Sequence, residues 1–414
     1  MDKIAKNVVA TTLLFLLALL TACGSSSKSD GSAPTPGVTR TIYIAAEDVV
    51  WDFAPTGVNQ IAGTPFANYT GALANEEPTV PTMTRRIAFD NVSSAADPVN
   101  FTADPAAIQV GTKYRKTLYF EYTDSTFTTR KTAAPEWRHL GSLGPVIRAE
   151  VSDTIKVVFK NKTETGRSFT VHPHGVFYDK PSEGAAYASG SPSDFTAGNS
   201  VAPGTTFTYT WEVPERAGPG PADGQSVMWM YHSHVNEPQD ENTGLIGPMI
   251  VYRKGAMKPV GAVGIDREFV VLFKVFDETD SFHFNSNLLT TKLAQPDIEA
   301  VILGGGFNPE PHLKHTMNGY IYGNLPLETM TMKKGEMVRW YLMSMGTEVD
   351  LHTPHWHGNT LLTMGGMRTD VVDVLPAQMI MADMMPDNIG TWLFHCHVND
   401  HIKAGMLARY KVDP

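Results

Sequence analysis

Short runs of β-branched and aromatic residues, in which apolar and polar positions often alternate, follow one another along most of the chain. Gly, Pro, Asn and Asp residues separate these runs, and no long amphipathic helix is indicated. This pattern is typical of antiparallel β-sandwiches. The clearest runs are TIYIAAEDVVWDF (41–53), KTLYFEYTD (116–124), DTIKVVFKN (153–161), TTFTYTWEV (205–213), GPMIVYR (247–253), REFVVLFKVFD (267–277) and EMVRWYLMSM (336–345).

The chain also contains an internal repeat. VHPHGVFY (171–178) resembles PHWHGNTL (354–361), and WMYHSHVN (229–236) resembles WLFHCHVN (392–399). Each copy of the repeat predicts one domain, and the two domains should have similar folds. We therefore expect an all-β protein with two tandem β-sandwich domains, residues 39–254 and 266–414.

Composition restricts the class of protein. The chain has 414 residues, enough for two or three cores, and its 42% apolar and 18% charged residues fit a folded globular protein. A formal net charge of −10 without a basic stripe argues against nucleic acid as a partner.

The N-terminus is typical of an exported protein. Lys3 and Lys6 precede a 13-residue apolar run that is short for a membrane span, and LTAC (20–23) follows it. This resembles a bacterial lipoprotein signal, with a signal peptide (1–22), a lipidated Cys23 and a flexible tether (23–38). We expect a lipid anchor in the cell envelope, on the periplasmic side of the outer membrane in a Gram-negative cell. The alternative is an ordinary secretory signal with an incidental cysteine.

Lipidation of Cys23 would leave Cys396 as the only other cysteine, so no disulfide could form within the chain. An unpaired cysteine in an exported protein suggests that a metal occupies it.

Most of the fourteen histidines fall into four clusters. Because residues i and i+2 of a strand share a face, each His-x-His pair presents two imidazoles side by side. Four such pairs, two per domain, could bind about three metal ions between two domains. The clusters are His172/His174, His232/His234, His352/His355/His357 and His395/His397/His401.

Strand parity separates a second group. Cys396 lies between His395 and His397 and therefore points to the opposite face, and His352 is offset from His355 by three. Two His, one Cys and a weak axial Met form the blue-copper ligand set. Core histidines or one zinc site would not account for eight further paired imidazoles. The second group is His352, Cys396, His401 and Met406.

In order, the motifs HxHG, HxH, HxxHxH and HCHxxxHxxxxM resemble those of the multicopper oxidases. Longer segments, such as SFTVHPHGVFYDKPSEGAAY, GTEVDLHTPHWHG and LFHCHVNDHIKAGM, are similar to one domain pair of ceruloplasmin and hephaestin, over roughly residues 40–413. The resemblance implies cupredoxin-like Greek-key domains and four coppers per functional unit.

The resemblance also assigns roles by position. It implies type 1 copper ligands at His352, Cys396, His401 and Met406, and type 2 ligands at His172 and His355. It implies type 3 ligands at His174, His232, His234, His357, His395 and His397. The first domain departs from the pattern, because Phe169 and Ser233 stand at its type 1 positions. We expect type 1 copper only in the second domain.

Activity and assembly follow from the same resemblance. Such oxidases take single electrons from a substrate at type 1 copper, pass them through a cysteine, here Cys396, and reduce dioxygen to water. In ceruloplasmin three domain pairs form a ring, so a chain with one pair is expected to form a head-to-tail homotrimer. The cluster would then lie between the first domain of one subunit and the second domain of its neighbour.

Three kinds of reductant remain open. Glu310, His315 and Asp400 match positions that hold iron in ferroxidases, although Glu310 could simply solvate its loop. Of 19 methionines, 13 lie in 317–406, which suits a cuprous oxidase because thioethers bind Cu(I), although Met also fills cores. A laccase-like oxidase of phenols or amines is the third alternative.

Glu183 matches an acid that supplies protons in related oxidases, and a solvated loop glutamate is the alternative. Two other classes fit less well. A copper nitrite reductase needs only three cluster histidines, and a copper-sequestering lipoprotein would not need a cysteine that joins two metal sites.

Overall fold

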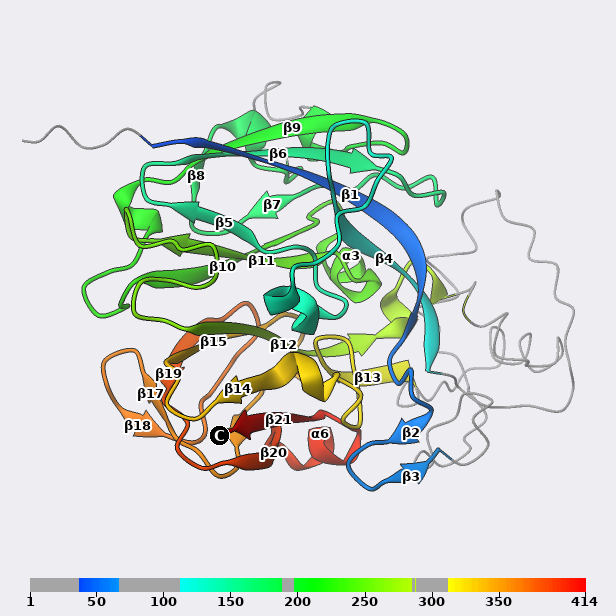
Figure 1. Ribbon diagram of the computed structural model, residues 1–414. Helices are drawn as coiled ribbons and strands as arrows, with labels where there is room; N and C mark the ends of the chain where they lie inside the picture. The colour runs from blue at the N-terminus through cyan, green and yellow to red at the C-terminus, as the bar shows by residue number, and fades with distance from the viewer. Residues whose placement is uncertain (1–36, 67–111, 188–196, 285–286, 288–311) are drawn as a thin grey trace, which may run out of the picture. The chain divides into compact units, whose positions relative to one another are not determined.

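The computed structural model describes residues 37–66, 112–187, 197–284, 287 and 312–414 (Figure 1). The predicted signal peptide, the tether up to residue 36 and the predicted site residue Glu310 lie outside the described residues. No helix in the described ranges is both long and apolar enough to cross a membrane.

The first β-sandwich is built from two sheets with strand orders β4-β1-β6-β9-β8 and β5-β11-β10-β7. Buried residues of both sheets form its core, among them Phe159, Trp211 and Met249. The strands are β1 (Thr39–Asp52), β4 (Lys113–Tyr122), β5 (Ile147–Glu150), β6 (Thr154–Asn161), β7 (His172–Pro173), β8 (Phe177–Tyr178), β9 (Thr206–Glu212), β10 (Ser226–His232) and β11 (Ile246–Tyr252).

The second β-sandwich has strand orders β13-β12-β15-β19-β17-β18 and β14-β21-β20-β16. Its core includes Trp340, Trp356 and Phe394. The strands are β12 (Arg267–Asp277), β13 (Leu313–Met317), β14 (Thr331–Lys333), β15 (Val338–Ser344), β16 (Pro354–Trp356), β17 (Leu361–Thr363), β18 (Arg368–Thr369), β19 (Met379–Met384), β20 (Gly390–Cys396) and β21 (Leu407–Asp413).

Short elements complete the fold. The strands β2 (Val58–Asn59) and β3 (Thr64–Pro65) pair with each other to form a two-stranded ribbon. The helices are α3 (Glu237–Thr243) and α6 (Asn399–Lys403), with 3-10 turns η1 (Pro135–Leu140), η2 (Lys180–Ser182), η4 (Ala197–Asn199), η5 (Glu215–Ala217), η6 (Glu278–Asp280) and η8 (Leu327–Met330).

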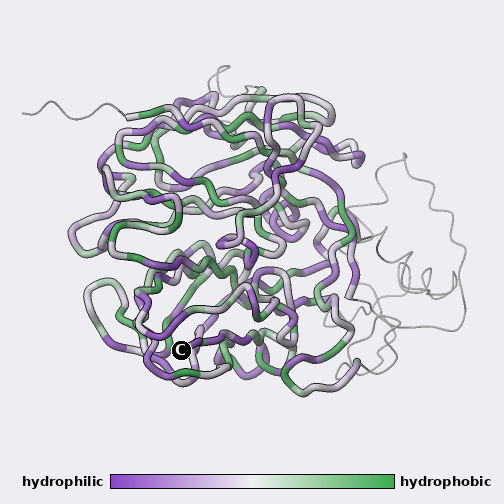
Figure 2. Tube along the Cα trace, viewed as in Figure 1, coloured by the Kyte–Doolittle hydropathy of each residue, from purple (hydrophilic) through white to green (hydrophobic). Residues whose placement is uncertain are grey.

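The prediction of an all-β fold with two tandem sandwiches is confirmed. The seven runs identified from the sequence are β1, β4, β6, β9, β11, β12 and β15. On β6 and β9 the buried residues alternate with less buried ones, whereas β11 and β15 are buried throughout and mostly apolar. Figure 2 shows the resulting changes between hydrophobic and hydrophilic residues along the chain.

The two sandwiches share a buried interface. One apolar cluster combines Met228 and Ile250 of the first with Val270 and Tyr341 of the second. Polar groups cross the same boundary, because the buried Glu268 accepts hydrogen bonds from Tyr252 and Tyr341, each at 2.8 Å. The boundary at residues 254–266 stays a prediction.

Candidate metal centre

A buried pocket in the second sandwich gathers a thiol and two imidazoles. Cys396 ends β20, His401 lies on α6, and His352 precedes β16. The Cys396 Sγ lies 3.5 Å from His401 Nδ1 and 3.8 Å from His352 Nδ1, and the two Nδ1 atoms are 3.2 Å apart. Three candidate ligand atoms therefore converge on one point.

Met406 adjoins this pocket through the backbone. Its carbonyl accepts a hydrogen bond from the Cys396 N–H at 3.2 Å, and its own N–H donates to His401 at 2.9 Å. The Met406 side chain is fully buried in the same apolar cluster as Cys396. The four residues chosen by strand parity are thus neighbours, and their roles as ligands stay a prediction.

The protonation of these groups suits metal binding. Burial lowers the pKa of His401 to about 4, with His352 adding to the effect, so the imidazole is neutral at pH 7. Burial raises the pKa of the Cys396 thiol. A metal ion must therefore displace the thiol proton on binding.

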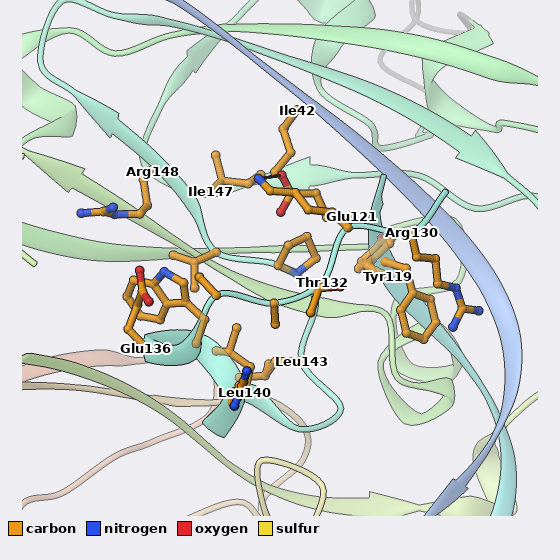
Figure 3. Close-up of a pocket in the computed structure, with 18 of the residues that line it drawn as sticks. Ile42, Tyr119, Glu121, Arg130, Thr132, Glu136, Leu140, Leu143, Ile147 and Arg148 are labelled. Carbon is orange, nitrogen blue, oxygen red and sulfur yellow. Dashed lines mark hydrogen bonds and ion pairs between the residues drawn. The ribbon is translucent and has the colours of Figure 1, made fainter. Parts of the chain in front are cut away.

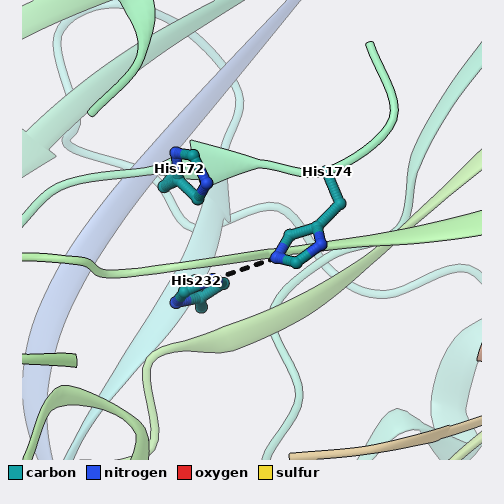
Figure 4. Close-up of side chains that lie close together, drawn as sticks. All are labelled: His172, His174 and His232. Carbon is teal, nitrogen blue, oxygen red and sulfur yellow. Dashed lines mark hydrogen bonds between the residues drawn. The ribbon is translucent and has the colours of Figure 1, made fainter. Parts of the chain in front are cut away.

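The first sandwich carries a separate histidine group, His172, His174, His232 and His234. β7 and β10 pair so that His172 lies opposite His232, and Figure 4 shows three of the rings converging. The Nε2 atoms of His174 and His232 lie 3.2 Å apart. Backbone carbonyls face the Nδ1 atoms of His172 (Glu183 O, 2.6 Å) and His232 (Ser233 O, 3.1 Å), which leaves Nε2 free for a metal ion.

The second sandwich repeats this plan with His355, His357, His395 and His397. His355 lies opposite His395 on β16 and β20, and the Nε2 atoms of His357 and His395 lie 3.1 Å apart. Backbone carbonyls again face Nδ1, at 3.0 Å for His355 (Asp370 O) and 2.7 Å for His395 (Cys396 O). The two groups therefore present equivalent nitrogen atoms.

Within one chain the two histidine groups remain apart. Every ring contact among these eight imidazoles joins two histidines of the same sandwich. Each group is thus half of the predicted cluster of eight, and a single chain does not bring the halves together.

Burial keeps several imidazoles of each group neutral at pH 7. Burial and neighbouring histidines lower the pKa of His174 to about 4 and that of His395 to about 4. The pKa of His232 falls well below its usual value for the same reasons. Neutral imidazole is the form that binds a metal ion, and crowded nitrogen donors suit copper.

Cys396 connects the pocket to the second histidine group. The His395, Cys396 and His397 residues are consecutive, and the Cys396 thiol faces His352 and His401 while His395 faces His357. This is the arrangement expected from strand parity.

The predicted accessory residues lie at different places. The Glu183 carboxylate pairs with Lys180 and accepts a hydrogen bond from Tyr187 at 3.1 Å, so the backbone of Glu183, not its side chain, contacts His172. Asp400 is exposed on α6 beside His401. The His315 ring on β13 lies 5.1 Å from that of His401, and burial lowers its pKa to about 3.

Two acidic residues near the candidate ligands were not identified from the sequence. Glu237 on α3 lies 3.1 Å from His234 Nε2, and Asp350 lies 3.3 Å from His352 Nε2. Asp350 precedes His352 by two positions, a spacing that would have placed both on one face of a strand.

A cavity of about 940 Å³ in the first sandwich lies between β1, β4, β5 and η1 (Figure 3). No candidate metal ligand lines it. Two of its cationic side chains are engaged elsewhere, because Arg130 pairs with Glu47 and Arg148 donates to backbone carbonyls. The cavity is separate from the metal centre.

Comparison with known proteins identifies the family. Residues 139–256 and 295–414 match models described as multicopper oxidase, and together these matches cover more than half of the chain. Mouse hephaestin is 38% identical over 385 residues, 92% of this chain and 30% of hephaestin. Human ferroxidase HEPHL1 is 36% identical over 378 residues, 91% of this chain and 29% of that protein.

Human ceruloplasmin is 35% identical over 380 residues, 90% of this chain and 30% of ceruloplasmin. The chain therefore spans about 30% of the length of these relatives. A crystal structure of a multicopper oxidase has the same fold, with a TM-score of 0.52 and 17% identity over 91% of this chain and 89% of that one. The chain belongs to the multicopper oxidases, whose cofactor is copper.

Proposed function

We propose that the protein couples the one-electron oxidation of a metal ion, Fe(II) or Cu(I), to the four-electron reduction of dioxygen to water. The observation that carries the proposal is the Cys396 pocket, with two buried imidazoles around a thiol whose strand neighbours belong to a four-histidine group. Bound copper would supply both the one-electron redox chemistry and the reduction of dioxygen.

The residues fit copper by donor type. His352, Cys396 and His401, with Met406, would hold type 1 copper. His172 and His355, whose rings sit at equivalent places in the two halves, would hold type 2 copper. The other six histidines, His174, His232, His234, His357, His395 and His397, would hold the type 3 pair.

Fe(II) is the substrate that we favour. Asp400 offers a solvent-exposed carboxylate beside His401, and His315 lies against the same ring. Hard oxygen ligands suit Fe(II), and one relative carries the name ferroxidase. Cu(I) is the second candidate because methionines are concentrated in the second sandwich. Phenols and amines would need only access to His401.

Oxygen uptake tests this choice. Steady-state rates with Fe(II), Cu(I) and a phenol are compared for the wild type, Asp400→Ala and a control variant, Asp387→Ala, at an exposed aspartate outside the predicted site. A selective loss of Fe(II) turnover in Asp400→Ala supports the cation site. Equal loss with all three substrates would indicate damage to type 1 copper and contradict a substrate site at Asp400.

Assembly is the second part of the proposal. We propose a head-to-tail homotrimer, in which the first-sandwich histidines of one subunit meet the second-sandwich histidines of its neighbour. The support is that each chain carries two separate half-clusters with equivalent geometry.

Mixing two inactive variants tests the trimer. His174→Ala disables the first half-cluster and His357→Ala the second, and mixed trimers would contain intact interfaces. Partial recovery of oxygen uptake after co-refolding is expected, together with a trimer mass by light scattering. A monomeric protein with full copper content and full activity would contradict the proposed trimer.

Export and anchoring form the third part. We propose that Cys23 is lipidated and holds the protein at the cell envelope, which the order Lys3, Lys6, apolar run and LTAC supports. Mass spectrometry of the extracted protein is expected to show acylated Cys23 as its first residue. Release of wild-type protein by a salt wash, without detergent, would contradict the anchor.

A further inference from the structure

The loop between β15 and β16 lies behind the two imidazoles of the Cys396 pocket. Asp350 in this loop places its Oδ1 at 3.3 Å from His352 Nε2, and both residues are 1% exposed. The backbone of Val349, in the same loop, adjoins the His401 imidazole. One loop therefore adjoins both imidazoles, each of which keeps its Nδ1 toward Cys396.

Asp350 is itself held firmly. Its Oδ1 accepts a hydrogen bond from Val275 N–H at 2.6 Å, and its Oδ2 accepts one from Thr347 N–H at 3.0 Å. Gly346 has a φ of +127°, and a Cβ there would meet Asp350 Oδ2 at 2.0 Å. The loop thus requires glycine at 346 to admit the carboxylate.

A buried cation faces the same glycine. A Cβ at Gly346 would also meet Lys274 Nζ at 3.1 Å, so Lys274 and Asp350 approach one another around this position. Lys274 is 1% exposed, and its Nζ lies 3.7 Å from Glu241 Oε2 on α3 of the first sandwich. A buried row of polar groups therefore runs from Glu241, whose pKa burial raises to about 7, through Lys274 to Asp350 and His352.

We infer that Asp350 is a positioning residue for type 1 copper, which fixes the Nε2–H tautomer of His352 and lowers the reduction potential of the site. The inference rests on the proposed function, in which His352 Nδ1 is a copper ligand. A carboxylate behind a ligating imidazole orients the ring and increases its basicity. Its negative charge favours Cu(II) over Cu(I), and Lys274 opposes this effect across a short, buried distance.

A purely structural role for Asp350 is the competing explanation, since the carboxylate also holds its own loop together. The two explanations predict different signs for the change in reduction potential. If the three residues only hold the loop together, substitution of Asp350, Lys274 or Glu241 should loosen the pocket and shift the potential in the same direction. Electrostatic control predicts opposite shifts for an anion and a cation.

The experiment uses copper-loaded full-length protein and three nearly isosteric variants, Asp350→Asn, Lys274→Met and Glu241→Gln. A redox titration that follows the type 1 absorption near 600 nm gives the reduction potential. We expect a higher potential in Asp350→Asn, a lower one in Lys274→Met, and a smaller rise in Glu241→Gln, because Glu241 reaches His352 only through Lys274 and Asp350. Copper affinity in Asp350→Asn is expected to fall about 10- to 100-fold.

A second readout needs no copper. Histidine ¹⁵N spectra of the apoprotein are expected to show His352 as the Nε2–H tautomer in the wild type and a tautomer mixture in Asp350→Asn. If Lys274→Met does not fold, the tautomer of His352 in Asp350→Asn still tests the inference, because a carboxylate that only held its loop together would leave the tautomer unchanged.

The outcomes separate the two levels of inference. Unchanged potentials and an unchanged tautomer in Asp350→Asn would overturn the role of Asp350 while leaving the oxidase proposal intact. Shifts of the reduction potential in the same direction in all three variants would indicate that these residues only hold the loop together. Wild-type protein that binds copper without a type 1 absorption would overturn the proposed function, and the role of Asp350 with it.

Discussion

The pocket around Ser233 in the first sandwich and the pocket around Cys396 in the second share a backbone plan. Ser233 N–H donates to Leu245 O at 3.1 Å, and Cys396 N–H donates to Met406 O at 3.2 Å. Thr170 N–H donates to Ser233 Oγ at 3.1 Å, as Thr353 N–H donates to Cys396 Sγ at 3.4 Å. The repeat seen in the sequence therefore extends to individual hydrogen bonds.

The two pockets are filled in different ways. In the first, Phe169 takes the place of His352, and Asp240 accepts hydrogen bonds from Ser233 Oγ, Val235 N–H and Asn236 N–H at 2.7 to 3.1 Å. In the second, a thiol and two imidazoles converge with no carboxylate between them. The fold can thus close this pocket with hydrogen bonds or offer it to a metal ion, and the side chains alone decide which.

The largest effect is expected from removing the thiol. Cys396→Ser keeps the shape of the pocket but removes the soft ligand, so the type 1 absorption and oxygen uptake should both disappear. Copper-loaded protein is followed by absorption near 600 nm and by oxygen consumption.

Ser233→Ala is the matched control for that experiment. It changes the equivalent position of the first sandwich, where the proposal expects no copper, and should leave the 600 nm absorption unchanged. Loss of the absorption in Ser233→Ala would contradict the expectation that only the Cys396 pocket binds type 1 copper.

Asp240→Ala tests whether hydrogen bonds sustain the first pocket. The substitution leaves two backbone N–H groups and the Ser233 hydroxyl without their buried acceptor, and it should lower the free energy of unfolding by about 3 kcal/mol. Urea unfolding of the apoprotein measures the change. A loss below about 0.5 kcal/mol would show that the network contributes little.

Asp240→Asn should act in the opposite direction. All three hydrogen bonds reach Oδ2, while Oδ1 is buried without a hydrogen-bond partner among the described residues, so an amide can keep the three bonds. Burial raises the pKa of Asp240 to about 6 from an ordinary value of 3.8. We therefore expect a gain of about 1–2 kcal/mol at pH 7, because one pKa unit corresponds to about 1.4 kcal/mol.

The pH dependence gives the sign of this effect. A carboxyl with a raised pKa in the folded state contributes stability that is present below pH 3.8 and lost as the pH rises through about 6. The advantage of Asp240→Asn should therefore shrink below pH 6 and vanish near pH 4. An advantage independent of pH would show that ionisation of Asp240 is not the cause.

The residues that bring about this contrast were predictable to different degrees. The hydrophobic pattern and the internal repeat predicted the two β-sandwiches. Strand parity predicted that Cys396 points away from His395 and His397. Both predictions were possible because they depend only on local spacing along the chain. Phe169 and Ser233 also marked the first pocket as different. Asp240 could not be identified, since its contacts depend on how a helix returns to the strands. The two-residue spacing of Asp350 and His352 is a signal in the sequence, but their contact depends on the conformation of a loop.

Tertiary contacts also decided which imidazole nitrogen atoms are available to a metal ion. The sequence contains the histidines but not the carbonyls of Glu183 and Asp370, 11 and 15 residues away from their partners, that orient His172 and His355. It likewise cannot tell whether two histidine groups meet within one chain. The structure shows them apart, and the proposed trimer would bring them together.

The smallest effect on the copper spectrum is expected from an attempt to convert the first pocket into the second. The double variant Phe169→His/Ser233→Cys restores two ligands, but the position that corresponds to His401 is Pro238, and Leu245 corresponds to Met406. Asp240 would also remain opposite the new thiol. The variant should therefore bind no additional blue copper, and its 600 nm absorption per chain should equal that of the wild type. A doubled absorption would show that the backbone plan, with one thiol and one imidazole, is sufficient for a type 1 site.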